Sequence, residues 1–206
     1  AACIKHFVAN DTEFERMTIS SEVDERTLRE LYLVPFEAAV RPIDEGGAYV
    51  RSMMSSYNRV NGTYVADDSG LMRSLLRDEW GWDGVVVSDW FAKMDTVASA
   101  LAGLDLEMPG PTRVRGEHLV RAVRDGEVDP AHVDECVTRL LRLFEWCGLF
   151  DGVVAGDEVT EDSAETREVI RRAAIAASVL LVNREVDRTP VLPLAPRTGR
   201  RSARRC

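Results

Sequence analysis

The chain has 206 residues, of which 45% are hydrophobic, and this content is sufficient for one sizeable core. Its formal net charge is −9 although five arginines lie in the last ten residues, so the body before them is more acidic than the total indicates. An acidic body repels a phosphate backbone, and no apolar run is long enough to span a bilayer. We therefore expect neither a nucleic-acid partner nor a membrane.

The cysteine pattern points to no metal or disulfide framework. The four cysteines are far apart and form no CxxC pair, which mildly favours a reduced, cytoplasmic setting. No charged and apolar leader opens the chain, and it has no initiator Met. Because residues 3–7 already resemble the inside of a strand, we expect the chain to begin within a domain.

The first 108 residues predict alternating strands and helices. Strands are expected at 2–7, 48–56, 84–87 and 103–108, where short apolar runs are bounded by turn residues. Helices are expected at 21–40, 69–80 and 92–101. Ser21 and Ser69 are the predicted caps of the first two helices. The apolar side chains expected to face inward in these two helices are Leu28, Leu31, Leu33, Val34, Phe36, Leu71, Met72, Leu75, Leu76 and Trp80.

The second half of the chain predicts mainly helices. Residues 116–125 and 130–147 form two of them, the second beginning at Asp129-Pro130, an N-cap followed by proline. Its inward stripe is expected at Val133, Val137, Leu140, Leu141 and Phe144. A linker at 152–156, a helix at 162–177 and a short strand at 179–182 follow. The Arg-rich residues 195–206 are predicted to be a disordered or non-native tail.

Chemistry-bearing residues occur at the ends of successive predicted strands. Lys5-His6, Ser56-Tyr57-Asn58 and Ser88-Asp89-Trp90 occupy this place. In parallel α/β folds the carboxyl ends of the strands meet around one pocket, so these residues are expected to converge. Carboxylate, lysine, histidine and indole without a Gly-rich phosphate loop favour a neutral polyhydroxyl ligand, because charged groups bind hydroxyls and indoles stack on sugar rings. Sugar chemistry fits best, and it requires neither a metal nor a cofactor.

Each of these side chains also has a purely structural interpretation. His6 and Tyr57 are compatible with ordinary packing, and Asp89 with capping of the next helix. Lys5 is compatible with a surface charge or with a Schiff-base lysine. Asp105 and Glu107 alternate with apolar residues in a predicted strand, so structural pairing with arginine or a backbone amide is expected for them.

Three motifs resemble glycoside hydrolase family 3, in its β-glucosidase branch. They are Lys5-His6-Phe7-Val8-Ala9-Asn10 followed by Glu13-Phe14-Glu15-Arg16, then Met53-Met54-Ser55-Ser56-Tyr57-Asn58-Arg59-Val60-Asn61-Gly62, then Val87-Ser88-Asp89-Trp90. The hexosaminidase branch carries a Lys-His-Phe-Pro-Gly-His-Gly pattern, which this chain lacks after Phe7. The resemblance runs from about residue 3 to 194.

The resemblance implies a retaining β-glycosidase acting on terminal β-linked sugars. Asp89 would be the nucleophile that forms the glycosyl-enzyme intermediate. Lys5, His6 and Arg16 would bind sugar hydroxyls. The remaining substrate-binding residues, which would line the subsite, are Met53, Tyr57 and Trp90, with Tyr57 orienting Asp89. The choice among glucosides, xylosides and related sugars stays open, because the resemblance places the leaving-group side in regions outside this chain.

The resemblance also implies a fold class and boundaries. The fold is α/β: the C-terminal half of a (β/α)8 TIM-like barrel at 1–112, a helical segment and linker at 113–160, and the beginning of an α/β sandwich domain at 161–194. A complete barrel needs about 250 residues. The acid/base glutamate of this branch lies in the sandwich domain, so we expect the isolated chain to be inactive.

Two other functions remain open. The chain is compatible with a non-catalytic sugar-binding remnant or subunit, completed by a partner chain or by oligomerisation. An aldolase that forms a Schiff base on Lys5 is the third interpretation. Half a barrel would expose unpaired strand edges and inner valines, which predicts aggregation or dimerisation.

Overall fold

The computed structural model describes residues 1–152, 156, 158–186, 189–190 and 192–194. The chain divides into two compact units, Ala1–Val154 and Ala155–Cys206. Within the described residues, no helix has the length and apolar character needed to cross a membrane.

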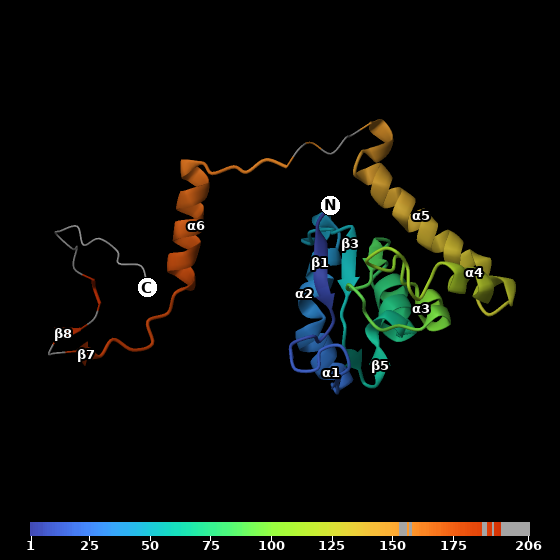
Figure 1. Ribbon diagram of the computed structural model, residues 1–206, viewed down its shortest axis with the longest axis horizontal. Helices are drawn as coiled ribbons and strands as arrows, with labels where there is room; N and C mark the ends of the chain where they lie inside the picture. The colour runs from blue at the N-terminus through green and yellow to red at the C-terminus, as the bar shows by residue number, and fades with distance from the viewer. Residues whose placement is uncertain (153–155, 157, 187–188, 191, 195–206) are drawn as a thin grey trace, which may run out of the picture. The chain divides into compact units, whose positions relative to one another are not determined.

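A parallel sheet forms the centre of the first unit (Figure 1). Its strands are β1 (Cys3–Phe7), β3 (Ser52–Ser55) and β6 (Val85–Val87), hydrogen-bonded in that order. A single parallel bridge joins Val87 to Leu106 and continues the sheet by one residue pair. The predicted α/β class with a parallel sheet is therefore confirmed, and the predicted strand at 103–108 is reduced to this bridge.

The second strand is shorter than its predicted range of 48–56. The N–H groups of Ala48 and Val50 donate to carbonyls near the end of the preceding helix, those of Ala38 and Ala39, at 3.4 and 3.0 Å. Because these N–H groups are engaged by the helix, they are not available to a sheet ladder. Pairing with β1 and β6 consequently begins only at Ser52.

A small second sheet lies at the other end of the long loop after β1. It contains β2 (Ser20–Ser21), β4 (Arg59–Val60) and β5 (Thr63–Tyr64), with β4 and β5 antiparallel. The turn between β4 and β5 contains Asn61 and Gly62, which have φ angles of 48° and 91°. Two consecutive positive φ angles are typical of the tight hairpin turn that Asn-Gly favours.

The predicted helix at 21–40 is divided and begins later. It comprises α1 (Glu25–Thr27), a π-helical turn η1 (Leu28–Tyr32) and α2 (Val34–Val40), followed by a 3₁₀ turn η2 (Ile43–Glu45). Ser21 pairs with β4 and so cannot cap the helix; the cap is Asp24, whose side chain accepts from the Thr27 N–H. Leu28, Leu33 and Phe36 are buried as predicted. Leu31 and Val34 were expected to face inward but are 62% and 49% exposed, because the π-helical turn shifts the helical period.

The next two helices pack beside β6. A 3₁₀ turn η3 (Val65–Asp67) leads into the π-helix η4 (Gly70–Glu79), whose cap is Asp68 rather than Ser69: the Asp68 carboxylate accepts from two backbone N–H groups. Its predicted core residues Leu71, Met72, Leu75 and Leu76 are buried, and Trp80 is partly buried. Helix α3 (Thr96–Ala102) starts four residues after the predicted start, where Asp95 caps it by accepting from the Ala98 N–H.

Two further helices end the first unit. They are α4 (Glu117–Arg124) and α5 (Pro130–Trp146), followed by a 3₁₀ turn η5 (Leu149–Asp151). Asp129 and Pro130 begin α5 as predicted. The predicted inward stripe of α5 is wrong in part: Val137, Leu141 and Phe144 are 46%, 47% and 39% exposed. Only one face of α5 finds a partner among the described residues, and the buried residue on it is Cys136.

The second unit contains one helix and one hairpin among its described residues. Helix α6 (Ala164–Ala177) is capped by Ser163, and β7 (Glu185–Val186) pairs antiparallel with β8 (Thr189–Pro190). The predicted strand at 179–182 is wrong: its four side chains are 61 to 87% exposed and find no strand partner in the described part of the chain. Most of the predicted linker at 152–156 and the whole predicted tail at 195–206 lie outside the described residues.

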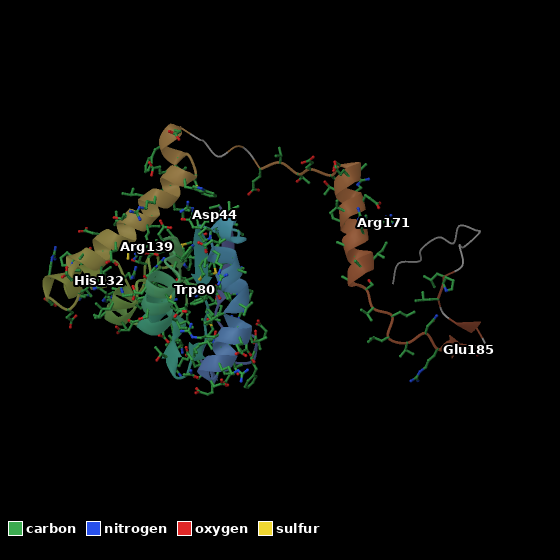
Figure 2. The ribbon with its side chains drawn as sticks, turned by 180° about the vertical axis from the view of Figure 1, so that it is seen from behind. Asp44, Trp80, His132, Arg139, Arg171 and Glu185 are labelled. Carbon is green, nitrogen blue, oxygen red and sulfur yellow. The ribbon has the colours of Figure 1, made fainter. Side chains whose placement is uncertain are left out.

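A buried carboxylate connects the sheet to two helices. The Asp105 side chain has no exposed surface and lies 3.1 Å from an Arg77 guanidinium nitrogen and 2.7 Å from Arg139 Nε. It also accepts a 2.7 Å hydrogen bond from the Val86 N–H in β6. Arg139, on α5, is labelled in Figure 2. The predicted structural pairing of Asp105 is confirmed, and this one residue joins β6, η4 and α5.

Glu107 has the backbone role that was expected for it. Its carboxylate accepts hydrogen bonds from the N–H groups of Arg113, Val114 and Arg115, at distances from 2.8 to 3.3 Å. Three N–H groups directed at one carboxylate fix the loop that follows the bridge at Leu106. The loop in turn supplies residues near the end of β6.

Replacing Asp105 with Asn should destabilise the first unit strongly. The substitution keeps the side-chain shape but leaves the buried Arg77 charge without a counter-charge and leaves Arg139 with Glu135 alone, at 3.7 Å. Removing one partner of a buried ion pair costs about 3–5 kcal/mol. Asp83→Asn is the matched control, because Asp83 is 43% exposed and pairs with Arg51 and Arg142 at the surface, where ion pairs contribute at most about 1 kcal/mol. Urea unfolding followed by circular dichroism measures both. Equal losses in the two variants would contradict this role of Asp105.

The Asp67 carboxylate should make the free energy of unfolding of the first unit depend on pH. It accepts the Asp95 N–H at 3.0 Å on each oxygen, and burial raises its pKa to about 6 from an ordinary 3.8. The folded state therefore binds this proton more tightly than the unfolded state does, so the stabilisation is complete below pH 3.8 and is lost as the pH rises through 6.

Asp67→Asn should remove that dependence, because the amide oxygen still accepts the Asp95 N–H but does not titrate. Relative to the parent chain, the variant should become more stable as the pH increases from 4 to 7. Urea unfolding at several pH values measures the difference in free energy. A difference that stays constant across this range would show that Asp67 does not titrate there.

Candidate active site

The site is built at the carboxyl end of β6. Ser88, directly after the strand, donates its N–H to the Leu106 carbonyl at 2.9 Å, and its hydroxyl accepts the Met108 N–H at 2.9 Å. These bonds fix the backbone on which Asp89 stands. The residue is 7% exposed, so its carboxylate is held at the edge of the sheet with little access to solvent.

Two partners orient the Asp89 carboxylate. Its Oδ1 accepts the Trp90 N–H at 2.7 Å, and its Oδ2 lies 3.5 Å from Nε2 of His6. His6 comes from β1, which lies at the opposite edge of the three-stranded sheet from β6. The predicted convergence of strand ends therefore brings together side chains that are 83 positions apart in the sequence.

Tyr57 and Arg16 extend this cluster. The Tyr57 hydroxyl donates a 2.8 Å hydrogen bond to the Trp90 carbonyl, and the Arg16 guanidinium lies 5.0 Å from the centre of the Tyr57 ring. Burial and the negative charge of Asp89 raise the pKa of Tyr57, so it stays protonated and able to donate at neutral pH. Arg16 also pairs with Glu13 at 3.1 Å.

The other three predicted residues are placed differently. The Trp90 side chain is 52% exposed beside Asp89, an arrangement that leaves its indole surface available. Lys5 is exposed and has no described contact with Asp89. Met53 is completely buried and belongs to the main hydrophobic core, whereas Met54, on the other face of β3, is partly exposed. The subsite role predicted for Met53 stays a prediction, and Met54 has the accessible surface that such a role requires.

The exposure of Lys5 bears on the aldolase interpretation. A Schiff-base lysine is activated by desolvation or by a neighbouring cation. Lys5 has an exposed side chain, and no described contact gives it such a neighbour. The geometry gives no support to that alternative.

Two residues of the predicted strand ends, Ser56 and Asn58, received no individual role from the sequence and support the backbone of the site. Asn58 has no exposed surface, and its amide donates to the carbonyls of Val8 and Ala9 at 3.2 Å each. The Ser56 hydroxyl accepts the Val8 N–H at 3.1 Å. These side chains fix the chain where it leaves β1, just after His6. Their position at a strand end was visible in the sequence, but their direction toward the backbone was not.

A metal centre is not formed by the described residues. Among them, no group of three or more His, Cys, Asp or Glu side chains is arranged to hold a metal ion. The thiols of Cys3, Cys136 and Cys147 are free. The candidate site is therefore a carboxylate with a histidine, a tyrosine, an arginine and an accessible indole.

Comparisons with known proteins agree on one family. Residues 1–143 match the family described as Glycosyl hydrolase family 3 N terminal domain. The chain is 51% identical over 195 residues to a beta-glucosidase of Rhizobium radiobacter, covering 95% of this chain and 23% of that protein. It is 42% identical over 193 residues to the probable beta-glucosidase J of Aspergillus fumigatus, covering 93% of this chain and 22% of that protein. The chain thus spans less than a quarter of the length of these relatives.

Solved structures give the same result. A beta-glucosidase from Kluyveromyces marxianus in complex with glucose superposes with a TM-score of 0.75 at 38% identity, covering 84% of this chain and 21% of that one. Beta-glucosidase 3B from Thermotoga neapolitana, in complex with glycerol, gives a TM-score of 0.73 at 36% identity, covering 83% of this chain and 24% of that one. The chain therefore belongs to glycosyl hydrolase family 3.

Proposed function

We propose that this chain supplies the nucleophile and part of the sugar-binding site of a retaining β-glucosidase. The observation that carries the proposal is the Asp89 carboxylate, which is 7% exposed at the end of a parallel strand and lies 3.5 Å from His6 and beside an exposed indole. A nucleophilic carboxylate needs a fixed position with at least one accessible oxygen, and a sugar ring needs an apolar platform. The Trp90 N–H and His6 support the fixed position of the carboxylate, and the exposed indole of Trp90 supports the role of platform.

In the first step, a carboxylate oxygen of Asp89 attacks the anomeric carbon of the substrate. The bond from that carbon to the leaving-group oxygen breaks, and the leaving group takes a proton from an acid. In the second step a water oxygen attacks the anomeric carbon, its proton passes to the group that earlier served as the acid, and the bond from that carbon to the Asp89 oxygen breaks, which releases the sugar and restores the carboxylate. Because the Trp90 N–H holds Oδ1, the geometry favours Oδ2 as the attacking atom.

The remaining residues of the cluster would bind the sugar. The His6 imidazole is placed to donate a hydrogen bond to a hydroxyl near the anomeric carbon, since it already borders Asp89. Arg16 and Lys5 are further charged donors, and the Trp90 indole is the platform. Tyr57 holds Trp90 through its carbonyl and so positions it relative to Asp89.

We further propose that the parallel strands are part of a (β/α)8 barrel, its C-terminal half, within 1–112. Support comes from strands that follow one another in sequence order, all parallel, with helices between them. A helical segment at 113–160 and the start of a sandwich domain at 161–194 complete the proposed division. The substrate is proposed to be a β-glucoside or a related glycoside.

We expect the chain alone to be inactive toward ordinary glucosides. Retaining hydrolysis needs a second carboxyl group about 5 to 5.5 Å from the nucleophile. In the family resemblance the acid comes from the sandwich domain, beyond the segments that carry the three motifs.

A sugar-binding subunit completed by a partner chain is the alternative function. It is favoured by the exposed apolar face of α5, where Val137, Leu141 and Phe144 have no cover among the described residues. In this case glucose would bind but no glycosyl ester would form on Asp89. The following experiment separates the two functions.

Incubation with 2,4-dinitrophenyl 2-deoxy-2-fluoro-β-glucoside should attach one fluoroglucosyl group to Asp89. Dinitrophenolate leaves without protonation, so this step does not depend on the acid. Mass spectrometry of the digested chain locates the ester. Asp89→Asn should abolish labelling, and the control Asp44→Asn, at an exposed carboxylate labelled in Figure 2, should retain it. Labelling of another residue, or none in the folded chain, would contradict the nucleophile assignment.

Tyr57→Phe should weaken glucose binding and lower the free energy of unfolding by no more than about 0.5–1.5 kcal/mol. The substitution removes only the hydroxyl that holds the Trp90 carbonyl, and a hydrogen bond of this kind contributes about 0.5–1.5 kcal/mol. Calorimetric titration with glucose and thermal unfolding measure the two effects. Tyr49→Phe is the control, because Tyr49 lies outside the cluster and contacts Arg51. Equal glucose affinity in the two variants would show that Tyr57 does not position the site.

A further inference from the structure

The backbone around Asp89 is attached to one neighbouring stretch of chain on both sides of the carboxylate. Before it, the Ser88 N–H donates to the Leu106 carbonyl at 2.9 Å, and the Ser88 hydroxyl accepts the Met108 N–H at 2.9 Å. After it, the Phe91 N–H donates to the Met108 carbonyl at 3.1 Å. Asp89 is thus held between two attachments to the same stretch, so a shift of that stretch would move its backbone.

The second attachment holds Phe91 in an unfavourable conformation. Its φ angle is 63°, in the left-handed region that a bulky side chain rarely adopts. The residue is 52% exposed, so burial does not hold it there. The contacts that do include the bond to the Met108 carbonyl and the Arg113 guanidinium, which lies 5.3 Å from the ring centre. Because backbone strain persists only where the surrounding structure imposes it, the chain after Asp89 depends on these contacts.

Glu107 fixes the stretch to which this backbone is attached. The residue is 6% exposed, and its carboxylate accepts the N–H groups of residues 113–115 at distances from 2.8 to 3.3 Å. Residues 110–113 are exposed, so they bury no side chain that could hold the loop in its place. The Thr96 hydroxyl adds one hydrogen bond, to the Val114 carbonyl at 2.6 Å. The Glu107 carboxylate therefore provides most of the hydrogen bonds that close the loop.

We propose that Glu107 is a positioning residue for the nucleophile. The inference rests on the proposed function, in which Asp89 attacks the anomeric carbon. Glu107 holds the loop, and the N–H and carbonyl groups of Met108 then hold the chain on either side of Asp89. Displacement of a reacting group by about 1 Å costs about 100-fold in rate. A buried carboxylate 18 positions after the nucleophile thus controls the rate of attack without touching the substrate.

The kinetics of labelling by 2,4-dinitrophenyl 2-deoxy-2-fluoro-β-glucoside test the inference, because they separate the rate constant at saturating reagent from the half-saturating concentration. Glu107→Ala should lower the rate constant about tenfold or more and change the half-saturating concentration by less than about threefold, since most of the proposed sugar-binding residues lie on other segments. Glu107→Gln keeps one acceptor oxygen for the N–H groups of Arg113 and Val114 and should restore part of the rate.

Asp129→Ala is the matched control for a general loss of stability. It removes the carboxylate that caps α5 by accepting the Ala131 N–H, and no described contact joins that side chain to residues 106–115. Both kinetic constants should stay within about twofold of the parent values, because the reacting groups are not displaced. Slowing equal to that of Glu107→Ala would overturn the inference, since it would show that lost stability alone is sufficient.

The remaining outcomes separate this inference from the proposed function. A Glu107→Ala rate constant within about threefold of the parent value overturns the inference and leaves the proposed function intact, whereas no labelling of the folded parent overturns both. Circular dichroism shows whether the variant is folded. If it is not, Ser88→Ala decides, because it removes only the hydroxyl that accepts the Met108 N–H: labelling should slow at least about threefold, and an unchanged rate contradicts the inference.

Discussion

The ionic contact between Asp105 and its two arginines is the constraint on which the rest of the first unit depends. A carboxylate without exposed surface requires counter-charges, and here they come from helices on two different segments, η4 and α5. The same carboxylate accepts the Val86 N–H, so the strand that ends at Asp89 is positioned by the group that also positions the helices. Burial lowers the pKa of Arg77 to about 10, which still leaves it charged at neutral pH. The Asp105 carboxylate therefore positions both the helices and the strand that leads to Asp89.

The acidic residues after β6 divide into structural and chemical roles according to their partners. Asp105 is satisfied by arginines and Glu107 by three backbone N–H groups, so neither has an oxygen to spare for catalysis. Asp89 differs because its carboxylate has fewer described partners, namely the Trp90 N–H on Oδ1 and the His6 imidazole 3.5 Å from Oδ2. A carboxylate at a strand end is a candidate for chemistry when its neighbours fix its position but leave one of its oxygens free of hydrogen bonds. This distinction depends on how many hydrogen-bond donors surround each carboxylate, and the spacing of residues in the sequence does not give that number.

Much of the site was predictable because strand ends in a parallel sheet converge whatever the details of packing. This rule alone placed His6, Tyr57, Asp89 and Trp90 together. The wrong predictions of burial arose where the surroundings of a side chain decide its exposure more than its hydrophobicity does. Met53 and Met54 are adjacent residues of the same type, yet only Met54 is accessible, because successive side chains of a strand point to opposite faces of the sheet. Leu31 and Val34 were misplaced because a π-helical turn has no clear sequence signal.

The hydrogen bond from Tyr57 to Trp90 holds the main chain of Trp90 and not its ring. The main chain of Trp90 is consequently held on both sides, by the segment that follows β3 and by the Asp89 carboxylate, while its side chain is 52% exposed. A change at Tyr57 would therefore act on the backbone whose N–H also holds one oxygen of the Asp89 carboxylate.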